Sequence, residues 1–157
     1  MDDLREIEAI KRLKYKYFRC LDLKLWKELR ELLVEDATSS YGGGKYAFDG
    51  RDQIMKFLED SLGRPTMLTS HHGHHPEIEL TSDTTATGIW ALEDVVIDTE
   101  HGITLRGASF YHDEYVKVDG AWKFKSTGYE RTYEEIESRA DTPSLRLLAN
   151  RFGPVED

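Results

Sequence analysis

The chain has 157 residues, a formal net charge of -9 at pH 7 and a single cysteine. Because this length is typical of one domain, we expect residues 1–157 to form a single unit with its own core. The negative charge argues against a nucleic-acid partner, and no apolar run is long enough to span a bilayer. The lone Cys20 excludes an internal disulfide and is typical of a small buried side chain, so we expect a cytoplasmic protein.

Helical patterns fill the first part of the chain. Apolar residues recur every three or four positions between Asp3 and Leu21, which predicts an amphipathic helix. A second, shorter helical pattern surrounds Trp26, and a third follows the cap signal Asp49-Gly50. The segments between the last two patterns are two extended stretches, 37–40 and 45–48, and a glycine turn at 42–44.

Long strand patterns follow, rich in β-branched and aromatic residues and separated by turn signals such as Asp119-Gly120. A short helix is expected near the C-terminus, over Ser144–Phe152. Helices first and hairpin-connected strands afterwards predict an α+β fold, in which a curved antiparallel sheet packs against the N-terminal helices and leaves a cavity between the layers. The predicted strands are Met67–Leu80, Thr85–Asp98, Ile103–Val118 and Ala121–Tyr133.

Several polar residues occupy places where a core would otherwise be apolar. Tyr17 and Asp22 stand at the end of the first helix, and Tyr41 follows the first extended stretch. The run His71–His75 contains four histidines, and Asp94 interrupts an apolar strand. Burying a charge without a partner is costly, so such positions suggest a function. A tyrosine, a histidine and two carboxylates facing one cavity would form a general acid–base site.

Each of these residues also has a purely structural explanation. Asp22 lies between two helical patterns and could be the N-cap of the second helix. Tyr17 lies on the apolar stripe of the first helix, where a tyrosine usually belongs to the core. The histidine run suggests zinc, but neighbours in a strand point to opposite faces, so at most two of the four could share a side. We therefore expect no metal, and spacing alone does not say which histidine faces inward.

Asp94 lies in a strand whose two faces are both apolar. We therefore expect both faces to be covered, and either Asp94 or its neighbour Glu93 to be buried with a partner. A structural ion pair with Arg106 or Arg131 explains such a carboxylate as well as a catalytic role does. Arg131 in turn is either a surface charge or a cavity group that binds an anion through two guanidinium nitrogens.

A family pattern runs through much of the chain, and its most specific parts are Leu92-Glu93-Asp94 and the Gly-Tyr-x-Arg-x-Tyr motif at 128–133. The matching segments are Ile7–Lys11, Lys16–Asp22, Thr38–Tyr41, Gly73–Ile78, Ala86–Asp94 and Thr127–Glu135. On the segment Tyr17–Leu29 the chain resembles the SnoaL-like branch of the NTF2-like superfamily, and on the segments above it resembles, within that branch, the bile acid 7α-dehydratases. The resemblance implies a cone-shaped α+β barrel over nearly the whole domain.

The resemblance also implies an activity, which is elimination of water from a 7α-hydroxy-3-oxo-4-ene steroid or bile acid, free or as a coenzyme A thioester. No cofactor is implied, because the enone of such a substrate accepts the electrons itself. The implied assembly is a homo-oligomer, a trimer. The catalytic residues that it implies are His71, Asp22, Tyr17 and Asp94, and the substrate-binding residues are Tyr41 and Arg131.

The roles implied by the resemblance form one mechanism. His71 removes a proton, since the ordinary pKa of an imidazole, about 6.5, lies near neutral pH. Asp22 accepts from the other ring nitrogen and fixes the tautomer. Tyr17 or Tyr41 donates to the enolate oxygen, and either protonated His71 or a protonated Asp94 gives a proton to the departing hydroxyl.

Two other readings remain open at this point. A base beside an oxyanion donor also suits a ketosteroid isomerase, or a dehydratase of a polyketide or terpenoid. A non-catalytic ligand-binding module on the same fold would leave Asp22 as a helix cap only. The tail, Ser138–Asp157, does not resemble the family.

Overall fold

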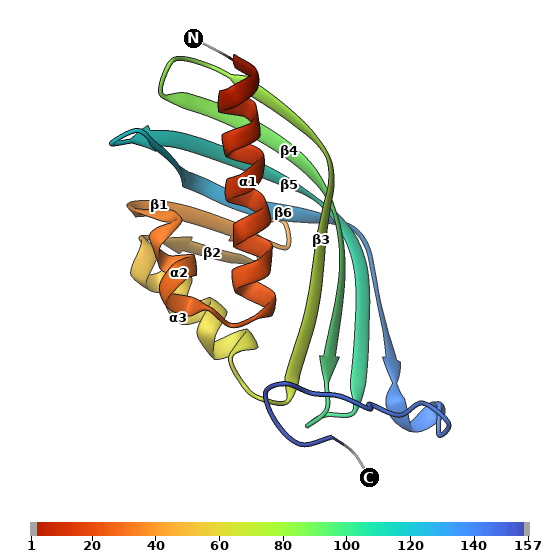
Figure 1. Ribbon diagram of the computed structural model, residues 1–157. Coiled ribbons are helices and arrows are strands. Elements are labelled where there is room, and N and C mark those ends of the chain that lie inside the picture. The colour runs from red at the N-terminus through yellow and green to blue at the C-terminus, as the bar shows by residue number, and fades with distance from the viewer. Residues whose placement is uncertain (1–2, 156–157) are drawn as a thin grey trace.

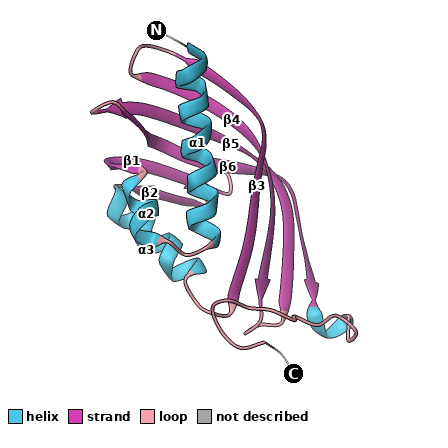
Figure 2. Ribbon diagram, viewed as in Figure 1, coloured by secondary structure: helices cyan, strands magenta, loops and turns pink. Residues whose placement is uncertain are grey.

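The computed structural model describes residues 3–155 and consists of helices packed against one sheet (Figures 1 and 2). The elements are α1 (Asp3–Asp22), α2 (Trp26–Glu31), β1 (Leu33–Tyr41), β2 (Tyr46–Asp49), α3 (Arg51–Leu62), β3 (Met67–Leu80), β4 (Thr85–Asp98), β5 (Ile103–Val118), β6 (Ala121–Ser138) and the 3-10 turn η1 (Arg139–Asp141). The predicted α+β class is confirmed. No helix within residues 3–155 is long and apolar enough to cross a membrane.

The sheet has the strand order β2-β1-β6-β5-β4-β3, and it bends so that its concave face receives α1 (Figure 1). Helix α1 is amphipathic, as its sequence pattern predicts, and its apolar stripe is buried against the sheet. Burial of this stripe stabilises the two layers, at roughly 25 cal/mol for each Å² of apolar surface removed from water. The buried stripe also carries Tyr17 and Cys20 into the interior.

The sheet is mixed, so the prediction of an antiparallel sheet is wrong in one place. Strands β1 and β6 are parallel, with Ser40 opposite Gly128, whereas the other neighbours are antiparallel. A side chain at Gly128 would meet the Ser40 carbonyl oxygen at 2.0 Å, so only glycine allows this close approach. Turn signals in a sequence predict the pairing of consecutive strands only. They could not predict the pairing of β1 with β6, because four other strands lie between these two in the chain.

The histidine run lies in β3, where the pairing with β4 shifts register between His74 and Glu77. His75 has a positive φ of 47°, which marks the irregularity, and Pro76 follows it. This bend changes the phase of the strand. Parity along the strand therefore cannot identify the inward-facing histidine.

The sequence predicts that both faces of β4 are covered, but the outer face of this strand is partly exposed. Ile89 is 36% exposed on this face, and the Glu93 side chain is 71% exposed. Asp94, on the opposite face, is buried. The sequence could not distinguish these faces, because an apolar residue on an outer sheet face is as compatible with solvent as with a partner.

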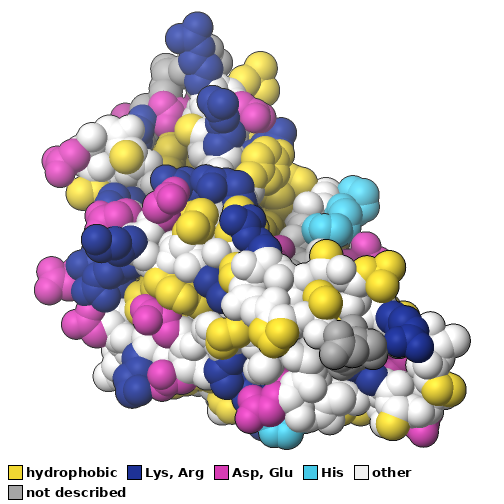
Figure 3. Space-filling view, turned by 60° about the horizontal axis from the view of Figure 1, so that its bottom comes forward, with side chains coloured by type: hydrophobic (Ala, Val, Ile, Leu, Met, Phe, Trp, Pro, Cys, Tyr) yellow, Lys and Arg dark blue, Asp and Glu magenta, His cyan; other side chains and the backbone are white. Residues whose placement is uncertain are grey.

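The C-terminal segment does not form the helix predicted over Ser144–Phe152. It runs as an irregular strap past the lower ends of the long strands to the loop before β3, where the Asn150 side-chain amide donates to the Pro65 carbonyl at 3.1 Å (Figure 1). Leu145 and Leu148 are exposed, Leu148 to 84%, so much of the predicted apolar face is left unpacked, and a short helix without such packing is unstable. At this end of the molecule, charges of both signs are dispersed among apolar side chains (Figure 3).

Candidate active site

A cavity of about 430 Å³ opens between the helices and the concave face of the sheet. Five of the six predicted site residues line it, and Asp22 lies behind one of them, His71. Aliphatic and phenyl side chains form the apolar part of the wall: Leu21, Phe57, Leu58, Leu62, Val96 and Leu105. The site therefore combines a largely apolar wall with a few polar groups, as pockets for small molecules usually do.

His71 and Asp22 form a hydrogen-bonded pair between the end of α1 and the start of β3. The Asp22 carboxylate accepts from His71 Nδ1 at 2.6 Å, from the His71 backbone N–H at 2.9 Å and from the Thr69 hydroxyl at 2.8 Å. The Phe18 ring stacks on the imidazole, with centroids 6.3 Å apart and planes 10° apart. These contacts hold the ring in one orientation and direct Nε2 to the cavity, the arrangement that a general base needs.

Asp22 is not the cap of the second helix. The N-cap of α2 is Leu25, without a side-chain hydrogen bond, and both Asp22 oxygens are bound to β3 instead. The structural alternative for this residue is therefore wrong.

Asp94 and Arg131 form a forked ion pair across the sheet. Both carboxylate oxygens accept from the guanidinium, with Nη2 3.0 Å from Oδ2, and Nη1 also donates to the Ser109 hydroxyl at 3.1 Å. A Cβ at Gly107 would lie 2.5 Å from Arg131 Nη1, so this glycine makes room for the arginine. Burial alone would lower the pKa of Arg131, but the hydrogen bonds and charge of Asp94 raise it.

The ion pair settles which arginine meets Asp94. Arg106, the other candidate, is paired with Glu137 on the exposed side of the sheet. Arg131 is therefore not a surface charge. Its two terminal guanidinium nitrogens already bind the Asp94 carboxylate, so they are not free to bind another anion.

Tyr17 and Tyr41 meet at the inner wall of the cavity. Their hydroxyl oxygens are 3.4 Å apart, and each side chain is buried. Burial raises the pKa of Tyr41 to about 12 and that of Tyr17 well above its ordinary value. Both hydroxyls therefore stay protonated at neutral pH and can donate to a ligand oxygen.

Three further tyrosines line the cavity, and the sequence reasoning assigned no site role to any of them. They are Tyr46 on β2, Tyr111 on β5 and Tyr129 on β6, and the rings of Tyr111 and Tyr129 pack edge to face with centroids 5.4 Å apart. Aromatic residues are common in strands, so their type alone did not mark them as site residues.

A buried ion pair next to this wall was also missed. Lys14 on α1 and Asp113 on β5 have fully buried side chains, with Nζ 2.7 Å from Oδ2. Asp113 shares strand parity with Tyr111 and Tyr115, a carboxylate among inward-facing aromatics. This is the signal that drew attention to Asp94, and it could have identified Asp113.

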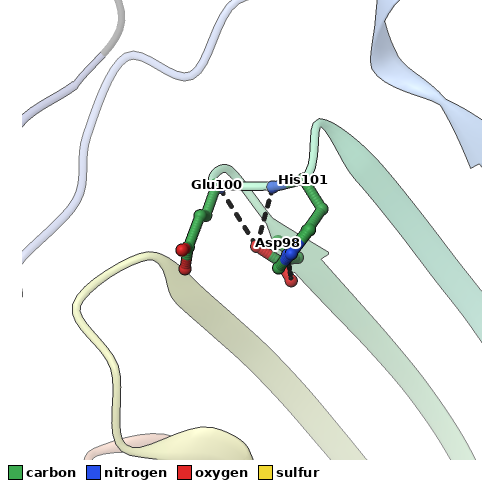
Figure 4. A group of neighbouring side chains, drawn as sticks. All are labelled: Asp98, Glu100 and His101. Carbon is green, nitrogen blue, oxygen red and sulfur yellow. Dashed lines mark hydrogen bonds and ion pairs between the residues drawn. The ribbon is translucent and has the colours of Figure 1, made fainter.

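The described residues contain one group whose geometry would suit a metal ion, at the β4–β5 turn (Figure 4). Asp98, Glu100 and His101 have ligand atoms within 4.8 Å of one another. Asp98, however, already accepts from both neighbouring backbone N–H groups and from His101 Nδ1, and the Arg64 guanidinium contacts both carboxylates. These bonds explain the cluster as a cap of the turn, outside the lining of the cavity.

The other histidines of the run take no part in the cavity lining. His72 is close to Ser70, and His74 is 3.2 Å from the exposed carboxylate of Glu93. The structure therefore selects His71 from the four candidates, a choice that strand parity could not make.

Comparisons with known proteins agree with this architecture. The model of the family described as SnoaL-like domain matches residues 2–128. Scytalone dehydratase arp1 of Aspergillus fumigatus is 31% identical over 152 residues, which cover 87% of this chain and 90% of that protein.

Solved structures give the same result. A protein provisionally named scytalone dehydratase, from Novosphingobium aromaticivorans, superposes with a TM-score of 0.79 at 33% identity, covering 85% of this chain and 88% of that one. Hexachlorocyclohexane dehydrochlorinase LinA-type3 from Novosphingobium barchaimii shares the fold, with a TM-score of 0.77 at 20% identity over 87% of this chain and 92% of that one. The predicted NTF2-like fold is thus confirmed, and the chain belongs to the SnoaL-like domain family, in which it is related to scytalone dehydratases.

Proposed function

We propose that the protein is a cofactor-independent dehydratase that eliminates water from a 7α-hydroxy-3-oxo-4-ene steroid or bile acid. The observation that carries the proposal is the His71–Asp22 pair, which presents an oriented imidazole to a cavity with an apolar wall and several phenolic hydroxyls. Relatedness to scytalone dehydratases supports the reaction class. The steroid itself rests on the resemblance to bile acid 7α-dehydratases.

The chemistry begins with removal of a proton by His71 Nε2. Asp22 accepts the Nδ1 hydrogen, which keeps Nε2 free to act as the base and stabilises the imidazolium that forms. The proton is acidic because the resulting negative charge spreads through the enone to the carbonyl oxygen. A tyrosine hydroxyl in the cavity lining stabilises that oxygen as the charge develops.

The elimination ends when the departing hydroxyl accepts a proton and leaves as water. The C–O bond breaks as electrons return from the enolate, and a new carbon–carbon double bond extends the conjugation. Both Asp94 oxygens already accept hydrogen bonds from Arg131, so we assign this proton to the protonated His71 rather than to Asp94. Asp94 and Arg131 then shape the polar side of the cavity and orient the substrate.

The cavity suits a ligand of the proposed kind. Its volume of about 430 Å³ lies within the range of small-molecule sites, roughly 300–1,000 Å³. Its aliphatic wall suits a hydrocarbon ring system. Lys45 in the lining can pair with the carboxylate of a free bile acid or with a phosphate group of its coenzyme A thioester.

The test is incubation of the purified protein with a 7α-hydroxy-3-oxo-4-ene bile acid, without added metal or cofactor. We expect the absorbance of the extended dienone to grow and the product to be lighter by one water. His71→Ala should lower turnover at least about 100-fold, whereas His74→Ala, in the same run but outside the cavity lining, should retain it. Equal activity of the two variants would contradict the site assignment.

A dehydratase of a smaller hydroxy-ketone is the second candidate, because two proteins more than 30% identical to this chain are named as scytalone dehydratases. A polyketide or terpenoid substrate would use the same base and oxyanion donor. Turnover of such a compound, with the bile acid bound but unchanged, would favour it. A ketosteroid isomerase would leave the product mass unchanged, and a non-catalytic module would bind ligands without altering them.

A further inference from the structure

A cation lies buried directly beneath the tyrosine wall of the cavity, and the mechanism above does not use it. Lys14 is fully buried, and its Nζ lies 2.7 Å from Asp113 Oδ2. Buried ion pairs are weak evidence for stability, because removing both charges from water costs as much as their attraction returns. The position of this pair therefore calls for another explanation.

The negative partner of the pair is held on the side away from the cavity. Asp113 also accepts hydrogen bonds from the Tyr115 hydroxyl at 2.8 Å and from the Thr127 hydroxyl at 2.7 Å. Neither Lys14 nor any of these three residues lines the cavity. Three donors thus surround the carboxylate and stabilise its charge where a ligand cannot reach it.

The positive partner faces the cavity wall. Lys14 Nζ lies 3.4 Å from the centroid of the Tyr111 ring and 5.0 Å from that of Tyr17, and both rings line the cavity. An ammonium at this distance from a ring interacts with its π electrons, and the interaction is strongest where water is excluded. The ion pair therefore acts as a buried dipole whose positive end, the Lys14 ammonium, contacts the tyrosine rings that line the cavity.

The hydroxyl of Tyr111 is available to a ligand. Among residues 3–155 it forms no hydrogen bond, whereas the Tyr17 and Tyr41 hydroxyls face each other. Burial raises the pKa of Tyr111 well above its ordinary value, which by itself weakens the phenol as a donor to an anion. A cation on the ring face has the opposite effect, because it draws electron density away from the oxygen.

We propose that Lys14 is a positioning residue for the elimination: held by Asp113 against the face of the Tyr111 ring, its ammonium strengthens the Tyr111 hydroxyl as the donor that stabilises the substrate oxyanion. The inference rests on the proposed function for the identity of that oxyanion. It identifies Tyr111 as the hydrogen-bond donor to the oxyanion. It also adds the charge of Lys14, which does not line the cavity but lies directly behind the Tyr111 ring.

The experiment compares two ligands of similar shape, 4-nitrophenol and nitrobenzene, at one pH at which much of the phenol is ionised. The phenolate imitates the enolate oxygen, and nitrobenzene has no such oxygen. We expect the wild-type protein to bind the phenolate more tightly than nitrobenzene. The double variant Lys14→Met/Asp113→Asn removes both buried charges together, and it should lower this preference about tenfold.

The matched control is Tyr115→Phe, which removes the hydrogen bond to Asp113 and the one accepted from the Trp90 indole N–H, but retains both charges and leaves the cavity lining intact. We expect it to keep the wild-type preference. If the charge pair had only a structural role, the double variant would weaken both ligands equally and leave their ratio unchanged. That result, or a wild-type protein without any preference for the phenolate, would overturn the proposal.

A double-mutant cycle tests the route through Tyr111. In the Tyr111→Phe background, the double variant should change the phenolate preference much less than in the wild type, because the donor is already absent. Fully additive effects would overturn the assignment to Tyr111. The readout is ligand binding rather than turnover, so its outcome stays separate from that of the bile acid assay.

Discussion

At the scale of single residues, the hydrogen bond between Asp22 and His71 predicts that turnover depends on the Asp22 carboxylate. Asp22→Asn preserves size, but its amide group does not supply the carboxylate charge that stabilises an imidazolium. We expect kcat on the active hydroxy-enone to fall by about 100-fold or more, with a much smaller change in KM. Steady-state kinetics measure both constants.

The control for this variant is Asp36→Asn, which alters a carboxylate on the surface that binds Lys125. It should leave both constants close to wild type. If Asp22→Asn also kept its kcat, His71 would not depend on Asp22, and another group would have to orient the imidazole.

Some residues of the site could be predicted from the sequence and others could not, and the difference has physical reasons. Asp22 and Asp94 stood out because a carboxylate in an apolar pattern needs a partner. The choice among the histidines of the run needed the bend at His75, which parity cannot reveal. Lys14 was missed because a lysine in an amphipathic helix is normally solvated, and only the fold brings Asp113 within reach of it.

At the scale of elements, Glu6 ties the first turns of α1 to the β5–β6 hairpin. Its carboxylate accepts from Lys117 Nζ at 2.8 Å and from the Trp122 indole N–H at 2.6 Å. The hydrogen bonds from these two donors lower the pKa of Glu6 below its ordinary value of 4.5. Because the pKa is lower in the folded state, this stability is present above about pH 4.5 and is lost as the pH falls through the folded-state pKa.

We therefore expect Glu6→Gln to flatten the decline of Tm with falling pH and to lower Tm most at neutral pH. Thermal unfolding between about pH 3 and pH 7 measures this difference. Glu8→Gln, which removes only an exposed contact with Lys11, should follow the wild-type profile. Parallel profiles for wild type and Glu6→Gln would show that the carboxylate does not couple folding to protonation.

The packing of α1 on β3 depends on Gly73. A Cβ at this position would lie 2.5 Å from the Phe18 ring, which also stacks on His71. Gly73→Ala should therefore destabilise the fold by roughly 1–3 kcal/mol, as overpacking does, and also disturb the imidazole. Denaturant unfolding and turnover measure the two effects, and Glu79→Ala, exposed on the same strand, is the control. Unchanged stability and turnover would mean that Phe18 moves aside freely.

The elements themselves were largely predictable, because periodicity is a local property. The ends of β3, β4 and β5 coincide with the predicted ones, and α1 ends one residue later than predicted. The parallel pairing of β1 with β6 was missed because it joins distant segments. The helix predicted over Ser144–Phe152 is wrong, because two of the leucines in its apolar pattern, Leu145 and Leu148, stay exposed in the described chain.

At the scale of the whole molecule, the convex face of the sheet carries apolar side chains that the fold leaves uncovered. Phe110 on β5 is 47% exposed and lies opposite Ala91, and Ile89 on β4 is 36% exposed and lies opposite His112. The sequence predicted a cover over this face of β4, and none of the described elements provides one. The trimer implied by the family resemblance remains a prediction, and this face is the surface at which it can be tested.

We expect the wild-type protein to sediment as three chains and Phe110→Glu to dissociate towards a single chain, because a carboxylate buried at a contact would lose its hydration. Sedimentation equilibrium gives both masses. Leu148→Glu places the same charge on an apolar residue of the C-terminal strap that is 84% exposed, so it should leave the mass unchanged. A wild-type protein that stays monomeric at high concentration would contradict the trimer. If instead Phe110→Glu kept the mass of a wild-type trimer, the contact would lie elsewhere, and the exposed phenylalanine would need no partner.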